Sequence, residues 1–158
     1  MEELREALKN AKRIVICGIG NDIRGDDSFG VYIAEKLKRV IKKANILVLN
    51  CGEVPENYTG KILNFHPDLI IFIDAVNFGG KPGEIIITDP ENTEGAGVST
   101  HSLPLKFLAT YLKANTNAKT ILIGCQPKNI GLFEDMSEEV KAVAEVLLKF
   151  LYESLELS

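Results

Sequence analysis

This chain alternates short apolar runs with longer stretches of helical periodicity along most of its length. Strands and helices that alternate favour a mostly parallel sheet with helices on both faces. We therefore expect an α/β fold of three layers, built on a twisted, mostly parallel five-stranded sheet. Buried strands are predicted at residues 13–17, 46–49, 68–74, 84–88 and 120–124. Helices are predicted at residues 28–43, 55–66, 104–113 and 137–155, the last with Ser137 as its N-cap.

The strand predicted at residues 84–88 departs from this parallel arrangement. The turn before it spans only residues 78–83, which is too short for a crossover helix. The strand is therefore expected to pair antiparallel with a neighbour or to lie at an edge. Residues 89–100 are rich in Gly, Asn and Glu and are predicted to form a loop. The absence of repeats and linkers predicts a single domain over residues 1–158.

The composition argues against several classes of function. Eighteen Lys and Arg against 22 Asp and Glu give a net charge of −4, which is a poor match to nucleic acid. No apolar run reaches the roughly 18 residues of a membrane span, and the first residues are too polar for a signal peptide. Three widely spaced cysteines form no disulfide framework. We expect a cytoplasmic protein that binds neither nucleic acid nor membranes, and nothing in the sequence indicates an oligomer.

The loop after the first strand is rich in glycine and contains two adjacent acids, Asp26 and Asp27. In open parallel sheets the functional crevice lies beyond the carboxyl ends of the strands, so this loop is a site candidate. It is not a dinucleotide fingerprint, because Ile23 occupies the third glycine position. It is not a phosphate loop either, because the two acids stand where Lys and Ser or Thr are needed. Two carboxylates would repel a polyphosphate.

Two aspartates and one histidine are the strongest site candidates. Asp26 has the better position for an N-cap of the following helix, which leaves Asp27 for another role. Asp74 ends the most apolar strand and either bonds the amides of residues 75–77 or belongs to a site. His101 follows a Gly-rich stretch and is a cap, a surface residue or a ligand. If the first and third strands are neighbours, the three residues form a metal site with open positions.

The remaining histidine and the cysteines are weaker candidates. His66 precedes Pro67 at a predicted helix end, where a surface or capping role is expected. The cysteines Cys17, Cys51 and Cys125 follow strands and need no role beyond that of small buried side chains. A Cys–His nucleophile pair stays open, although nothing marks one thiol as activated. The sequence has no Gly-x-Ser-x-Gly motif, so a hydrolase serine is not indicated.

Several short motifs, in this order and spacing, resemble the maturation endopeptidases of [NiFe] hydrogenases from about residue 14 to the final helix. The motifs are Gly18-Ile19-Gly20-Asn21, Arg24-Gly25-Asp26-Asp27, Ile73-Asp74-Ala75, Ser99-Thr100-His101 and Gly124-Cys125-Gln126-Pro127. Three further segments are most similar to the branch that serves formate-hydrogenlyase-type hydrogenases: Pro55-Glu56-Asn57, Pro82-Gly83-Glu84-Ile85 and Thr100-His101-Ser102-Leu103-Pro104-Leu105. Ser28 stands where the family usually has Gly, a departure that removes no ligand.

The resemblance implies an aspartic-type endopeptidase that removes the C-terminal extension of a nickel-loaded hydrogenase large-subunit precursor. Its metal-contacting and catalytic residues fall on Asp27, Asp74 and His101, and the nickel comes with the precursor. Residues 94–100 are expected to order around the substrate tail. Two alternatives stay open from the residues themselves: a docking or chaperone module that binds the precursor without cleaving it, and a small-molecule hydrolase.

Overall fold

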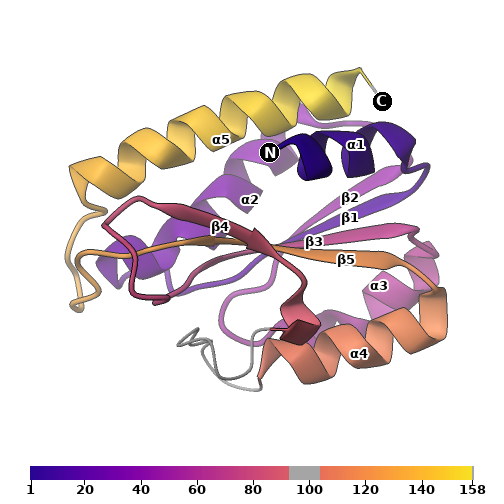
Figure 1. Ribbon diagram of the computed structural model, residues 1–158, viewed down its shortest axis with the longest axis horizontal. Helices are drawn as coiled ribbons and strands as arrows, with labels where there is room; N and C mark the ends of the chain where they lie inside the picture. Colours follow the sequence, from indigo (N-terminus) through magenta and orange to yellow (C-terminus); the bar gives the residue numbers. More distant parts are fainter. Residues whose placement is uncertain (93–103, 158) are drawn as a thin grey trace.

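The computed structural model describes residues 1–92 and 104–157, and within them five strands form one sheet (Figure 1). The strand order is β2-β1-β3-β5-β4; β1, β2, β3 and β5 are parallel, and β4 is antiparallel to β5 at the edge. The predicted sheet and its antiparallel edge strand are confirmed. The strands are β1 (Ile14–Gly18), β2 (Ile46–Asn50), β3 (Leu69–Ala75), β4 (Ile85–Thr88) and β5 (Lys119–Cys125).

Five α-helices and three short 3-10 turns lie within the described residues. The helices are α1 (Glu2–Asn10), α2 (Phe29–Val40), α3 (Thr59–Phe65), α4 (Leu105–Thr116) and α5 (Glu138–Glu156). The 3-10 turns are η1 (Gly25–Ser28), η2 (Pro55–Tyr58) and η3 (Pro90–Asn92). None of these helices combines the length and apolar character that crossing a membrane requires.

The predicted helices are present with shifted bounds, and two predictions need correction. Helix α1 was not predicted; its Leu4 and Leu8 lie one turn apart and are both buried. In the predicted loop at residues 89–100, Pro90–Asn92 forms a 3-10 turn, and residues 93–100 lie outside the described part of the chain. Ser137 caps α5 as predicted, because its hydroxyl oxygen accepts from the backbone N–H of Val140.

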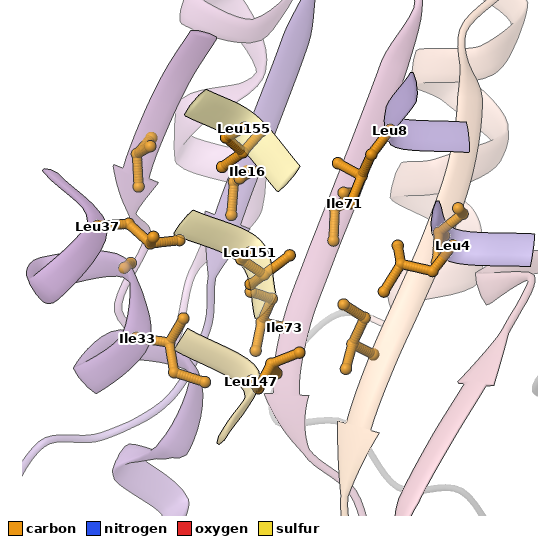
Figure 2. Packing of buried hydrophobic residues seen from close by; sticks show 14 of the residues in the cluster. Leu4, Leu8, Ile16, Ile33, Leu37, Ile71, Ile73, Leu147, Leu151 and Leu155 are labelled. Atoms are coloured by element: carbon orange, nitrogen blue, oxygen red, sulfur yellow. The ribbon is translucent and has the colours of Figure 1, made fainter. Parts of the chain in front are cut away.

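Helices α1, α2 and α5 cover one face of the sheet, and α3 and α4 cover the other (Figure 1). Alternating side chains of each strand enter the two layers, and each buried Leu or Ile contributes about 1.5–3 kcal/mol relative to exposure. Ile71 and Ile73 of β3 pack on the α5 side, whereas Phe72 packs on the α4 side. Figure 2 shows the first layer, with the α5 residues Leu147, Leu151 and Leu155 beside Ile16, Ile33, Leu37, Ile71 and Ile73.

Helix α2 lies unusually close to the sheet because glycines occur at the contact. A Cβ atom on Gly30 would lie 2.1 Å from the carbonyl oxygen of Ile73 and 2.4 Å from that of Ile19. A Cβ atom on Gly18 would lie 2.2 Å from the carbonyl oxygen of Gly30. No side chain fits at either position. This contact holds the start of α2, and η1 before it, against the carboxyl end of β3.

Candidate functional site

Backbone hydrogen bonds at the carboxyl end of the sheet join the loop after β1 to β3 and to the loop after β2. The N–H of Ile19 donates to the carbonyl oxygen of Ile73 over 2.8 Å. The N–H of Gly20 donates to Gly52 over 2.9 Å, and that of Cys51 donates to Gly18 over 2.8 Å. This is the edge at which an open α/β sheet forms its crevice.

Asp27 lies in η1, where the chain doubles back over the loop after β1. Its carbonyl oxygen accepts from the N–H of Asn21 over 3.2 Å. Gly20 has a φ of 148°, and a Cβ atom there would lie 2.0 Å from the same carbonyl oxygen. Glycine at position 20 therefore permits the tight return that presents Asp27. The side chain is 6% exposed, so little of the carboxylate faces water.

Asp74 is the second-last residue of β3 and is completely buried. It pairs with Gly124 of β5, while Ile73 before it pairs with Gly18 of β1. The 3-10 turn η1, which carries Asp27, contacts β3, which carries Asp74, and the expected neighbour relation of β1 and β3 is present. Their action as metal ligands or catalytic groups stays a prediction.

The side chain of Asp74 is directed toward the face of the sheet that α4 covers. Phe72 and Val76, two residues to either side, belong to the apolar cluster that includes Leu105 and Leu108 of α4. Since successive side chains of a strand alternate between faces, Asp74 shares this direction. Helix α4 begins at Leu105, and Pro104 is the residue at its N-cap position. In the sequence, His101 comes three residues before Pro104.

His101 itself lies outside the described residues, as do residues 94–100. Of the predicted three-residue metal site, the structure thus describes Asp27 and Asp74. Among the residues that the structure describes, no three His, Cys, Asp or Glu side chains form a group that could hold a metal ion.

The prediction that Asp26 caps α2 is wrong. The residue at the cap position of α2 is Ser28, and no side chain caps that helix. Asp26 is completely buried and instead binds the loop between β5 and α5. Its carboxylate accepts four hydrogen bonds, from the N–H groups of Lys128 (2.8 Å), Asn129 (2.9 Å) and Ser137 (2.6 Å) and from the Ser137 hydroxyl (2.8 Å). A buried carboxylate requires such donors, and here they come from a distant segment.

Gln126 organises the loop that follows Asp74, a role that the sequence did not reveal. Its Oε1 atom accepts from the backbone N–H groups of Phe78 (2.9 Å) and Gly80 (3.0 Å). Its Nε2 group donates to Oδ1 of Asn77 over 3.1 Å. The sequence feature that could have indicated this role is a polar residue directly after the apolar run of β5. In the structure Gln126 is only 8% exposed.

Cys17 and Cys125 are poor nucleophiles in this environment. All three cysteines are buried and free. A hydrogen bond with the Cys51 thiol, together with burial, raises the pKa of Cys17 well above its ordinary value. Burial, with a smaller contribution from the Asp26 carboxylate, raises the pKa of Cys125 to about 12. Protonated thiols do not attack carbonyl carbons, so the Cys–His alternative loses support.

His66 has the surface role that the sequence predicted. It is exposed and ends α3 in the left-handed conformation, with a φ of 54°. Its N–H donates to the carbonyl oxygen of Leu63, which closes the last turn of the helix.

Comparison with known proteins defines the class. The family model described as HycI, hydrogenase maturation protease, matches residues 31–154. The hydrogenase 3 maturation protease of Escherichia coli K12 is 33% identical over 139 residues, which cover 87% of each chain. The chain is thus a peptidase, a hydrolase of peptide bonds that acts in hydrogenase maturation.

Solved structures agree with this class and with the fold. The crystal structure of a [NiFe] hydrogenase maturation protease HycI from Thermococcus kodakarensis KOD1 is 53% identical and has a TM-score of 0.92. That comparison covers 98% of this chain and 99% of the other. The solution structure of the Escherichia coli endopeptidase HycI is 29% identical, with a TM-score of 0.78 over 89% and 90% of the two chains. The chain belongs to the HycI family of hydrogenase maturation proteases.

Proposed function

We propose that this peptidase removes the C-terminal extension of a nickel-loaded [NiFe] hydrogenase large-subunit precursor. The observation that supports the proposal most is that two buried acids, Asp27 of η1 and Asp74 of the adjoining β3, occur in a hydrogenase maturation protease. The precursor is a protein partner, and the nickel is its cargo.

In this proposal the two carboxylates recognise the nickel ion held by the precursor. Two carboxylates with the imidazole of His101 would leave positions for ligands from the substrate, so the ion is shared between the two proteins. A shared ion gives the enzyme a higher affinity for a loaded precursor than for an empty one. This difference in affinity makes metal loading a condition for cleavage.

Hydrolysis requires a water molecule to attack the carbonyl carbon of the scissile peptide bond. The carbon–nitrogen bond then breaks, and the amine of the released peptide takes up a proton. Two assignments are compatible with the carboxylates: the shared ion polarises the carbonyl group, or an aspartate outside the coordination sphere removes a proton from the water. Cysteine chemistry is not needed, since the thiols of Cys17 and Cys125 stay protonated near neutral pH.

Cleavage assays with nickel-loaded and nickel-free precursor test the proposal. Each precursor is incubated with the enzyme, and the mass of the large subunit is measured by mass spectrometry. We expect loss of a C-terminal peptide from the loaded precursor alone. Equal cleavage of both forms would contradict nickel recognition, and binding without cleavage of either form would indicate a docking module.

A further inference from the structure

Four apolar side chains are exposed on the two loops that adjoin η1, and we call them the apolar patch. They are Ile23 at 43%, Ile130 at 55%, Leu132 at 50% and Phe133 at 77% exposure. Ile23 lies in the loop between β1 and η1, and the other three lie in the loop between β5 and α5. The N–H of Phe133 donates to the carbonyl oxygen of Ile23 over 2.6 Å, so the two loops lie side by side.

The apolar patch is joined to the segment that carries Asp27. The N–H of Asp26 donates to Asn129 over 2.6 Å, and the N–H of Gly25 donates to Glu134 over 3.0 Å. The Asp26 carboxylate adds its four hydrogen bonds to the same loop. The loop also begins beside Asp74, because Cys125 at the end of β5 pairs with Ala75. The loop between β5 and α5 therefore runs from the strand end next to Asp74 to the turn η1, which holds Asp27.

Phe133 has a backbone conformation that bulky residues rarely adopt. Its φ is 65°, in the left-handed region that favours glycine and asparagine. Such a conformation costs on the order of 1–3 kcal/mol and is maintained only by the surrounding structure. Here the hydrogen bond to Ile23 and one from the Glu134 N–H to Gly131 maintain it. A conformation of this cost that leaves an aromatic ring exposed suggests a binding role.

The surroundings of the apolar patch resemble the polar border of a protein interface. Charged residues of both signs are exposed around it: Asp22, Arg24, Lys128, Glu134 and Asp135. An apolar centre with an exposed aromatic residue and a charged border is typical of a protein-binding surface. Any protein whose chain reaches Asp27 must also approach the adjoining loop, whereas a second copy bound there would obstruct that approach.

We propose that the apolar patch docks the folded body of the hydrogenase precursor and thereby brings its C-terminal extension to Asp27 and Asp74. This inference rests on the proposed function, since the occupant is the same substrate. The ring of Phe133 is the main anchor, because it is the most exposed member of the patch and aromatic residues dominate binding energy at interfaces.

The variant Phe133→Asn tests the proposal. Asparagine tolerates the left-handed conformation, so the fold is retained while the ring is removed. Val146→Asn is the matched control, because Val146 is 71% exposed on α5, away from the loop. We expect the KM for nickel-loaded precursor to rise about tenfold or more in Phe133→Asn, with a smaller change in kcat, and to stay unchanged in the control.

A binding measurement separates failure of docking from failure of the proposed function. The affinity of the nickel-loaded precursor is measured for the wild type and for Phe133→Asn by calorimetry. If the wild type binds but does not cleave, a weaker affinity in the variant still supports docking and only the proposed function fails. An unchanged KM and affinity in Phe133→Asn would overturn the proposal. The proposal would also be overturned if the wild type formed a dimer, Phe133→Asn dissociated that dimer, and the affinity for precursor stayed the same.

Discussion

The backbone N–H of Ile19 lies 2.8 Å from the carbonyl oxygen of Ile73, across the ends of β1 and β3. This hydrogen bond extends the pairing of the two strands past Gly18. Asp74 directly follows Ile73, and the loop that begins at Ile19 leads to Asp27. Asp74 is therefore fixed by the strand backbone, whereas Asp27 is held in η1 by backbone hydrogen bonds to the loops after β1 and β5.

The variant Gly30→Ala should disturb this arrangement. Its Cβ atom would lie 2.1 Å from the carbonyl oxygen of Ile73, so α2 must shift away from β3. We expect a loss of about 2–3 kcal/mol in the free energy of unfolding, measured by urea denaturation, and a decrease in cleavage. Gly60→Ala in α3 is the control, because nothing lies within 4 Å of its Cβ position, and it should keep or raise stability. Equal stability of the two variants would contradict the close contact.

The variant Asp26→Asn should cost more stability than the loss of a helix cap. An amide group has only one acceptor oxygen, so its NH₂ group would face backbone N–H donors of residues 128–137. We expect destabilisation of about 2–4 kcal/mol, compared with at most about 0.5 kcal/mol for the exposed Asp22→Asn. Thermal unfolding monitored by circular dichroism measures both. A loss as small as that of Asp22→Asn would show that the four hydrogen bonds contribute little.

The variant Gln126→Ala should loosen the loop after Asp74. It removes the acceptor for the N–H groups of Phe78 and Gly80. We expect faster amide hydrogen exchange at these two positions, with exchange in β3 unchanged, since the strand keeps its neighbours β1 and β5. Unchanged exchange at Phe78 and Gly80 would indicate that other contacts hold the loop.

The thiols should be unreactive in the folded protein near neutral pH. Burial raises the pKa of the Cys125 thiol from its ordinary 9.0 to about 12 in the folded protein. The contribution of this thiol to stability is therefore complete below about pH 9 and is lost as the pH rises toward about 12. Treatment with iodoacetamide at pH 8 should leave the folded protein unmodified and active, and should label it after denaturation. Labelling of the folded protein, together with loss of cleavage activity, would support a cysteine nucleophile.

The sequence was sufficient to predict the sheet, its edge strand and the neighbour relation of the strands that precede Asp27 and carry Asp74. Apolar strands with helices between them have few arrangements, and the usual neighbour relation of the first and third strands held here. Asp74 was identifiable because an acid at the end of the apolar run 69–73 requires an explanation. These inferences depend on patterns that are local in the chain.

The role of Asp26 was not predictable from local patterns. Its hydrogen-bond donors lie 102 to 111 residues further along the chain, so only the folded structure brings them to its carboxylate. Helix α1 was missed because most of its residues are charged and only two of them, Leu4 and Leu8, are buried. Both errors concern residues whose partners are distant in sequence.

Cleavage of nickel-loaded precursor by the variants Asp27→Asn and Asp74→Asn, followed as the mass of the large subunit, tests the central claim most directly. Both substitutions keep the size of the side chain and remove its charge, and Glu6→Gln on α1 is the exposed control. The account predicts that each aspartate variant folds but leaves the precursor uncleaved, while Glu6→Gln cleaves it like the wild type. Cleavage at the wild-type rate by both aspartate variants would contradict it.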